Sequence, residues 1–325
     1  MAPSRRRPFS YIQLYDNLFI FPDPLPKGAT VLKLSQQQVD EFNKSGFLIA
    51  RGALQDTDLQ PVIDELSTWI DQRARELHAA GDIANLHEDA PFSQRYGLLF
   101  AQSNDMGKDF DIMRYRGRAT FEFLHNENLL ELLESLLGPE LTCNPIQHLR
   151  AKPPLAHEGN AGPSFHNAPW HQDAGVMMAE AEYSNIVTCW LPIGDATQEM
   201  GCMEVLPGLV ETGYLDHQRE GGTTIRPELM PEIEPVVAAC TKGDVVLMSC
   251  FTPHRSTPNY SDQCRWSFDL RYQPTGAHTG RTGHPDFVVR SRQDPATEMR
   301  NYDEWCRLWL DAFENPSGFV GHRSK

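Results

Sequence analysis

The chain of 325 residues carries a formal net charge of −15, and hydrophobic residues make up 40% of it and charged residues 22%. This balance is that of a folded globular protein that can bury a substantial core. The acidic charge argues against general binding to nucleic acid or to anionic membranes.

The sequence shows no signal for membrane insertion or export. No apolar run approaches the roughly 20 residues of a membrane-spanning helix, and the basic cluster 5–7 is not followed by the apolar stretch of a secretory signal. The seven cysteines are scattered through apolar stretches without a Cys-x-x-Cys pair, so we expect reduced, buried thiols. We therefore expect a cytoplasmic protein. Its oligomeric state stays open, a homo-oligomer included.

The first 140 residues are predicted to be mostly helical. Residues 1–34 are rich in proline and are expected to form an irregular arm. Ser35 is a typical N-cap for a helix that Gly46 ends, and a short strand, FLIARGAL, follows it. Apolar residues at helical spacing predict two more helices, TDLQPVIDELSTWIDQRARELHAAG and ENLLELLESLLG, each ending at a glycine.

After residue 140 short runs of β-branched and aromatic residues alternate with turn residues. The runs are NIVTCWLPI, CMEVLP, PVVAACT, VVLMSCF and RWSFDLRY. Such strands predict a sandwich, a barrel or a jelly roll, and NYDEWCRLWLDAF predicts a closing amphipathic helix. We therefore expect one α+β, mainly β domain, with a helical part over 35–140, a β core over 141–275 and a C-terminal extension over 276–325.

Four His-x-acid pairs are candidates for two ligands of a metal ion. They are His171 with Asp173, His87 with Asp89, His284 with Asp286, and His125 with Glu127. In a strand, residues i and i+2 point to the same face, so such a pair can bind one ion from one side. The last three pairs lie in loop-like or helix-capping stretches, and we expect them to be solvated surface groups. His166 either lines a pocket mouth or lies in a loop.

A third ligand has to come from elsewhere in the fold. Two imidazoles and one carboxylate on one face form the facial triad of non-haem Fe(II) oxygenases, and a 2-oxo acid cosubstrate needs an arginine for its far carboxylate. In 2-oxoglutarate oxygenases an arginine follows the second histidine at the spacing that separates His254 from Arg265. No other histidine of this chain has an arginine at that spacing.

The strand RWSFDLRY alternates cleanly. Its apolar residues are Trp266, Phe268, Leu270 and Tyr272, and its polar residues are Arg265, Ser267, Asp269 and Arg271. In one interpretation this is a barrel strand whose apolar face is covered by helices and whose polar face lines a solvated interior, which places Arg265 and Ser267 together. In the other it is a half-exposed edge strand with its charges in water. Arg271 either contacts the substrate or pairs with Asp269, and the pairing is favoured.

Four stretches, PWHQD, VTCWLPIGDATQEMGCMEVLPG, KGDVVLMSCFTPHRS and CRWSFDLRY, resemble the phytanoyl-CoA dioxygenase (PhyH) family, a branch of the Fe(II)/2-oxoglutarate oxygenases. The resemblance spans about residues 35–275 and is strongest after 145. It implies a double-stranded β-helix, or jelly roll. It also implies that His171, Asp173 and His254 bind Fe(II), and that Arg265 binds the distal carboxylate of 2-oxoglutarate.

The resemblance also implies further contacts to the cosubstrate. Ser256 matches a family hydroxyl two residues after the distal histidine, and Ser267 matches an Arg-x-Ser pattern. Trp190 matches a flanking aromatic residue, although it can equally be a core residue, and Gln147 and Arg118 lie near positions that contact the cosubstrate in some members. Asp173 stands where halogenating relatives have Ala or Gly, which implies reaction with O2 to oxygenate the substrate.

The implied function is oxidation, foremost hydroxylation, of a C–H bond in a small organic molecule. The tail DLRYQPTGAHTGRTGHPDFVVRSR resembles microbial relatives that modify natural products. Acyl-CoA hydroxylation is an alternative, although no basic cluster suited to a CoA phosphate is evident. Two others are a jelly-roll metalloprotein of another class, such as a cupin-type isomerase, which would not need Arg265, and a noncatalytic relative that binds a partner.

Overall fold

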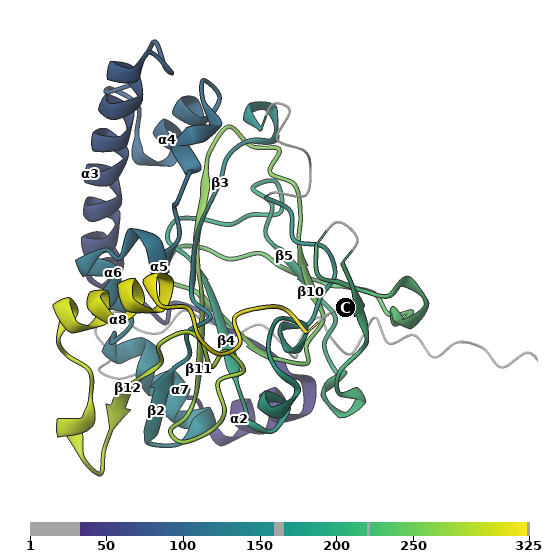
Figure 1. Ribbon diagram of the computed structural model, residues 1–325. Coiled ribbons are helices and arrows are strands. Elements are labelled where there is room, and N and C mark those ends of the chain that lie inside the picture. The colour runs from purple at the N-terminus through teal and green to yellow at the C-terminus, as the bar shows by residue number, and fades with distance from the viewer. Residues whose placement is uncertain (1–32, 159–165, 220–221, 324–325) are drawn as a thin grey trace, which may run out of the picture.

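The computed structural model describes residues 33–158, 166–219 and 222–323, so the arm expected over 1–34 falls almost wholly outside it. Figure 1 shows most of the helices on one side of the strands. The helices are α2 (Gln36–Ser45), α3 (Asp56–Ala80), α4 (Phe92–Phe100), α5 (Ile112–Tyr115), α6 (Arg118–Phe123), α7 (Glu127–Leu137) and α8 (Tyr302–Glu314). The predictions of α2, α3, α7 and α8 are confirmed, whereas the short α4, α5 and α6 were not predicted.

The helix boundaries follow from capping residues. The Ser35 hydroxyl accepts a hydrogen bond from the backbone of Gln38, and the Gln38 side chain accepts one in return, which forms a capping box. Gly46 ends α2 with φ at 70° and Gly81 ends α3 with φ at 83°. Both glycines adopt the left-handed conformation that other residues enter only at a cost.

The strands form two main antiparallel sheets. The seven-stranded sheet has the order β1-β9-β4-β11-β2-β12, and β3 also pairs with β11. Its strands are β1 (Phe47–Ala50), β2 (Glu140–Cys143), β3 (His148–Lys152), β4 (Val187–Pro192), β9 (Val245–Ser249), β11 (Arg265–Pro274) and β12 (Phe287–Ser291). The three-stranded sheet has the order β10 (His254–Ser256), β5 (Met203–Val205), β8 (Val236–Ala238). A small hairpin pairs β6 (His217–Gln218) with β7 (Thr224–Ile225).

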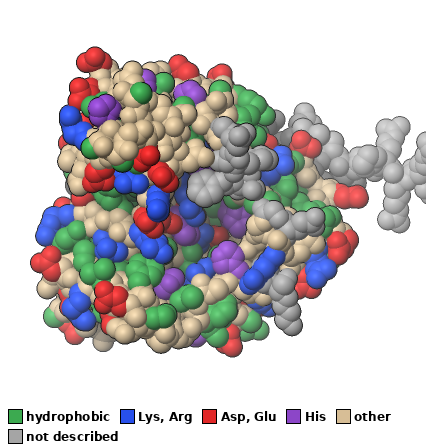
Figure 2. Space-filling view, turned by 45° about the horizontal axis from the view of Figure 1, so that its top comes forward, with side chains coloured by type: hydrophobic (Ala, Val, Ile, Leu, Met, Phe, Trp, Pro, Cys, Tyr) green, Lys and Arg blue, Asp and Glu red, His purple; other side chains and the backbone are tan. Residues whose placement is uncertain are grey.

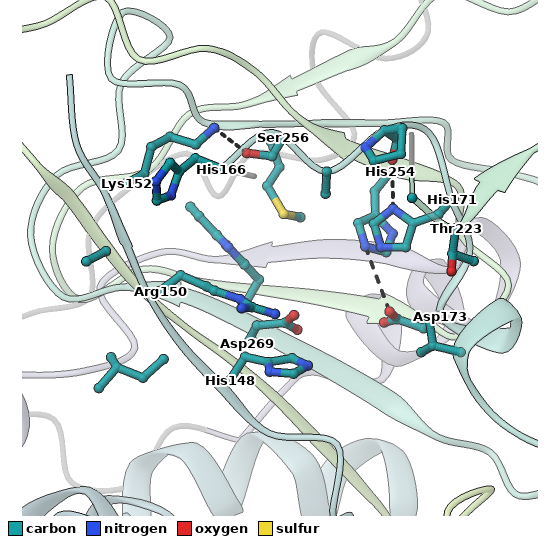
Figure 3. Close-up of a pocket in the computed structure, with 18 of the residues that line it drawn as sticks. His148, Arg150, Lys152, His166, His171, Asp173, Thr223, His254, Ser256 and Asp269 are labelled. Atoms are coloured by element: carbon teal, nitrogen blue, oxygen red, sulfur yellow. Dashed lines mark hydrogen bonds and ion pairs between the residues drawn. The ribbon is translucent and has the colours of Figure 1, made fainter. Parts of the chain in front are cut away.

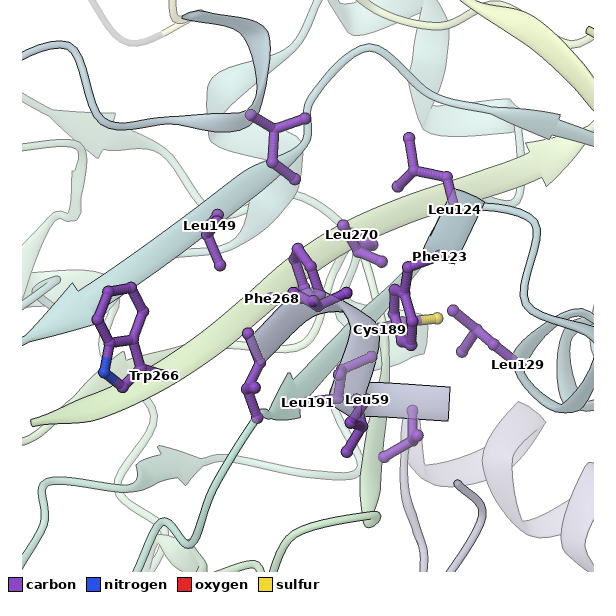
Figure 4. Close-up of a cluster of buried hydrophobic side chains, with 14 of the residues drawn as sticks. Leu59, Phe123, Leu124, Leu129, Leu149, Cys189, Leu191, Trp266, Phe268 and Leu270 are labelled. Atoms are coloured by element: carbon purple, nitrogen blue, oxygen red, sulfur yellow. The ribbon is translucent and has the colours of Figure 1, made fainter. Parts of the chain in front are cut away.

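The main hydrophobic core lies between the large sheet and the helices. Trp266, Phe268, Leu270 and Tyr272 of β11 belong to it with apolar residues of α3 and α7, and Figure 4 shows Phe268 beside Phe123 and Leu149. The rings of Phe268 and Phe123 stack with centroids 4.9 Å apart. β11 is therefore a central strand with a helix-covered apolar face, and the edge-strand alternative is wrong.

A second apolar cluster joins the two sheets face to face. It combines Phe47, Trp190 and Met248 of the large sheet with Met203 and Val205 of the small one. Together the clusters give three layers, namely helices, large sheet and small sheet. The region between the sheets is the place where polar residues of their inner faces meet.

The large sheet also takes strands from outside the stretch expected to form the β core. β1 comes from the part predicted to be mostly helical and pairs with β9, and β12 comes from the C-terminal extension and pairs with β2. All seven cysteines are free thiols and six of them are buried, as predicted. Within the described ranges, no helix combines the length and the apolar character required to span a bilayer.

Candidate metal centre

His171, Asp173 and His254 come together although 81 residues of sequence separate the last two. His171 and His254 face each other in an antiparallel bridge, with their backbones exchanging hydrogen bonds of 3.0 and 2.9 Å. Asp173 begins the short 3₁₀ helix η3 (Asp173–Val176) directly after that bridge. One ligand atom from each of the three side chains lies within 4.8 Å of the others.

The hydrogen bonds of the two rings leave the same nitrogen of each free. His171 Nδ1 lies 2.8 Å from the carbonyl oxygen of Pro169, and His254 Nδ1 lies 2.9 Å from that of Thr252. Carbonyls accept only, so both Nδ1 atoms carry a proton and Nε2 is the nitrogen of each ring left to bind a metal. Burial, and then His254, lower the pKa of His171 to about 4, which keeps that ring neutral. Two neutral imidazoles and a carboxylate are the donor set that Fe(II) accepts.

Gln172, between two ligands, fixes the loop that carries them. Its side-chain amide donates to the carbonyls of Gly213 and Phe251 and accepts from the backbone of Leu215. The backbone N–H of Gln172 donates to Nε2 of His217 at 2.9 Å. These bonds tie the loop to two distant segments, 213–217 and the one that contains Phe251, so the positions of His171 and Asp173 are set without a metal.

Both carboxylate oxygens of Asp173 have a protein partner. Thr188 on β4 donates to Oδ2, and Nη2 of Arg271 on β11 lies 2.5 Å from Oδ1. Burial alone would raise the pKa of Asp173, but Arg271 and the two histidines hold it far below its ordinary value. Arg271 also lies 3.3 Å from Asp269, so the predicted pairing of these two residues is confirmed. The prediction did not include the closer contact of Arg271 with Asp173. Arg271 orients the acidic ligand as well.

A cavity of about 530 Å³ lies between the two sheets and contains the three ligands. Figure 2 shows a hollow with Lys, Arg and His side chains gathered around it, although the chain as a whole is strongly acidic. In Figure 3 the ligands lie at one side of the cavity and Lys152 and Ser256 at the other. The cavity therefore has one side with the three candidate metal ligands and a separate side with basic residues.

Arg265 is buried on the cationic side, and no carboxylate of the described residues pairs with it. Its Nη1 donates to the carbonyl of Gly201 at 3.3 Å, and its Nε has no hydrogen-bond partner. The guanidinium lies over the ring of Trp190, 5.2 Å from the centroid. Burial lowers the pKa of Arg265 to about 10, so the group remains charged near neutral pH. A buried guanidinium in a cavity with free N–H groups has the charge and the donors to bind an anion.

Lys152 is a second buried basic side chain beside Arg265, and it was not predicted. It pairs with Arg265 in the register of β3 and β11, and its Nζ donates to Ser256 Oγ at 2.5 Å and to Asn167 Oδ1 at 2.8 Å. Burial, and then Arg265, lower its pKa to about 6. The alternation in HLRAK, residues 148–152, could have indicated it, because it places three basic residues on one strand face.

Three residues assigned to the cosubstrate do not line the cavity. Ser267 lies on the face of β11 that carries Arg265, but its buried hydroxyl has no partner. Gln147 donates to the backbone carbonyls of Asn144 and Arg271 and thereby supports the chain. Arg118 is 58% exposed at its side chain and packs over the ring of Tyr302 at 4.2 Å, so it does not reach the cavity. Trp190, Ser256 and His166 do line it.

The competing His-x-acid pairs form no such cluster within the described residues. His87 is half-buried at the start of a turn, and its partner Asp89 is exposed, as expected for a surface group. His125 was expected to be solvated and is instead buried against Phe121, with Nδ1 3.1 Å from its carbonyl oxygen, while Asn126 caps α7. His284 is also partly buried, against Trp309. The expectation of solvated groups is therefore wrong for these two histidines.

Comparison with known proteins agrees with this site. A family model described as phytanoyl-CoA dioxygenase (PhyH) matches residues 42–267. The chain belongs to the phytanoyl-CoA dioxygenase family. Its members include the 1-deoxypentalenic acid 11-beta-hydroxylase of Streptomyces exfoliatus, which is 27% identical over 78% of this chain and 86% of that protein.

Solved structures share the fold. The apo form of the non-heme monooxygenase ThoJ superposes with a TM-score of 0.59 at 21% identity, over 85% of this chain and 93% of that one. The epimerase SnoN, solved in complex with Fe3+, alpha ketoglutarate and nogalamycin RO, gives a TM-score of 0.50 at 18% identity, over 75% and 86% of the two chains. Membership of the phytanoyl-CoA dioxygenase family, together with the cluster of His171, Asp173 and His254, makes this chain an iron- and 2-oxoglutarate-dependent oxygenase.

Proposed function

We propose that this family member hydroxylates a C–H bond of a small organic molecule at an Fe(II) ion held by His171, Asp173 and His254. The observation that carries the proposal is the cavity itself, which combines a preformed three-ligand cluster with a buried, unpaired guanidinium. With 2-oxoglutarate and O2, bound Fe(II) supplies the oxidising chemistry, and the protein supplies position and exclusion of water.

The ligand cluster fits such an ion. Both histidines offer Nε2 and have their Nδ1 atoms bonded to backbone carbonyls, which holds the rings in one orientation. Arg271 and Thr188 hold the carboxylate of Asp173, so it is ionised and in place. The three ligands come from one side, which leaves the cavity side open for the cosubstrate and substrate.

Arg265 is proposed to bind the distal carboxylate of 2-oxoglutarate through two parallel N–H···O bonds. Ser256 lines the same end of the cavity and is positioned by Lys152. Trp190 packs on the guanidinium and limits its freedom. A cupin-type isomerase would not require this arrangement, so the buried Arg265 favours the oxygenase function.

The two facing antiparallel sheets support a jelly-roll, or double-stranded β-helix, core within a single domain. The 1-deoxypentalenic acid hydroxylase and the monooxygenase ThoJ support a small-molecule substrate and a place in specialised metabolism. Free, buried cysteines support a reducing compartment such as the cytoplasm.

The test is turnover of 2-oxoglutarate. We would supply Fe(II), 2-oxoglutarate and O2 with a panel of small molecules that includes 1-deoxypentalenic acid, and measure succinate together with oxygenated product. The expected result is metal-dependent succinate formation that a substrate accelerates and that His171→Ala abolishes. Product formation independent of 2-oxoglutarate would overturn the proposal.

A further inference from the structure

Four arginines are buried among the residues that the structure describes, and they differ in their partners. Arg271 and Arg290 form ion pairs with carboxylates as close as 2.5 and 2.6 Å. Arg265 and Arg281 have no carboxylate partner within those residues, and both line the cavity. Because a buried arginine is rarely without a partner, the two unpaired ones mark two places for anions.

Arg281 is 9% exposed and rigidly held. Its Nε donates to the carbonyl of Val176 at 2.8 Å and its Nη1 to that of Val320 at 2.7 Å. Val176 ends the short helix η3 that Asp173 begins, so Arg281 is fixed relative to the metal ligands. Its second terminal nitrogen, Nη2, has no partner in the described parts of the chain, and Nη1 retains a second N–H.

Arg281 lies at a different part of the cavity from Arg265. Burial, and then Arg271, lower the pKa of Arg281 to about 10, whereas Arg265 has Arg150 and Lys152 as its cationic neighbours. Arg265 and Arg271 are six residues apart on β11, or about 20 Å along a strand. One molecule of 2-oxoglutarate at Arg265 therefore leaves Arg281 without an anion.

We propose that Arg281 binds an anionic group of the substrate, which makes the substrate a small organic acid. The planar guanidinium is suited to the oxygens of a carboxylate or a phosphonate. The cationic lining of the cavity, within a chain of net charge −15, favours entry of such an anion. This inference rests on the proposed function, because 2-oxoglutarate has to occupy Arg265.

The experiment compares probes of similar shape and different charge. Zn(II) would replace Fe(II) so that no turnover occurs, and 2-oxoglutarate would be present at saturation. Ligand-detected NMR titrations would then give the affinities of phenylacetate, phenylphosphonate and the neutral phenylacetamide. The variants are Arg281→Gln and the matched control Arg307→Gln, which removes the same charge from an exposed position on α8.

We expect the two acids to bind at least about tenfold more tightly than the amide, and Arg281→Gln to weaken the acids by about 10- to 100-fold. Arg307→Gln should leave all three affinities unchanged. If Arg281→Gln does not fold, the affinities of the natural protein for the two acids and for the amide still test the inference.

Three results would overturn this inference and leave the proposed function intact. The first is equal affinity for the acids and the amide, including no detectable binding of either, and the second is acid binding that survives Arg281→Gln. The third is acid binding that saturating 2-oxoglutarate abolishes, since this would place the anion at Arg265. Failure of 2-oxoglutarate itself to bind the metal-loaded protein would overturn the proposed function as well.

Discussion

Replacement of Arg265 by Met should have opposite effects on cosubstrate binding and on the stability of the protein without cosubstrate. Arg265 is buried; among the described residues it has no carboxylate partner, and the only hydrogen bond that its guanidinium donates goes to the carbonyl of Gly201 at 3.3 Å. Loss of two charge-assisted hydrogen bonds to 2-oxoglutarate, at about 1.5–3 kcal/mol each, corresponds to an affinity about 10²- to 10⁴-fold lower. Removal of an uncompensated buried charge should leave the unfolding free energy unchanged or raise it.

Arg290→Met is the matched control. Arg290 is equally buried but pairs with Glu127 and Glu134 at 2.6 Å, so its loss should lower the unfolding free energy by about 3–5 kcal/mol. It should leave the affinity for 2-oxoglutarate unchanged. The assays are anaerobic titration of the Fe(II)-loaded protein with 2-oxoglutarate, and urea denaturation without it. The reasoning is refuted if Arg265→Met binds 2-oxoglutarate within a few-fold of the natural protein, or is destabilised as much as Arg290→Met.

Three further predictions concern the residues around the cavity and the core. Arg271→Met should weaken metal binding by about 10- to 100-fold, because Asp173 loses the partner that orients it; a chelator competition that shows equal affinity would contradict this. Lys152 has its pKa lowered to about 6 by burial and then Arg265, so it is mostly neutral at pH 8 in the free protein. The anionic cosubstrate favours its charged form, and binding should therefore take up a proton and weaken as pH rises above about 6. Calorimetry in buffers of different ionisation enthalpy should detect this uptake in the natural protein and not in Lys152→Met; equal uptake in both would exclude Lys152 as its source. Phe268→Ala should lower the unfolding free energy by about 3–5 kcal/mol in urea denaturation and leave metal affinity unchanged, since Phe268 is fully buried in the helix-covered core; a loss below about 1 kcal/mol would refute its placement.

The parts of the fold that sequence predicted are those with a strong local periodicity. β11 alternates strictly over Arg265–Tyr272, and the structure places its apolar residues under the helices and lines the cavity with Arg265, Asp269 and Arg271. Helix α3 carries an apolar stripe and a terminal glycine, and α2 carries a capping serine and a terminal glycine. Short α4 and α6 lack enough turns to show such a stripe, so tertiary packing decides them.

The parts that sequence did not predict depend on contacts between distant segments. Arg271 was assigned to its near neighbour Asp269, whereas its closest acidic partner is Asp173, which is 98 residues away. Arg281 lies in a turn and donates a hydrogen bond to the carbonyl of Val320, which is 39 residues away in the sequence. No local pattern encodes such contacts, because the path of the intervening chain determines them.

The cavity is proposed to bind Fe(II) and 2-oxoglutarate together. The most direct test of this proposal is the visible spectrum of the purified protein under anaerobic conditions, recorded after addition of Fe(II) and again after addition of 2-oxoglutarate. We expect a weak charge-transfer band that needs both additions and that is absent from His171→Ala and from Arg265→Met at the same cosubstrate concentration. Bound iron without this band, or a band that His171→Ala retains, would contradict the assignment of the site.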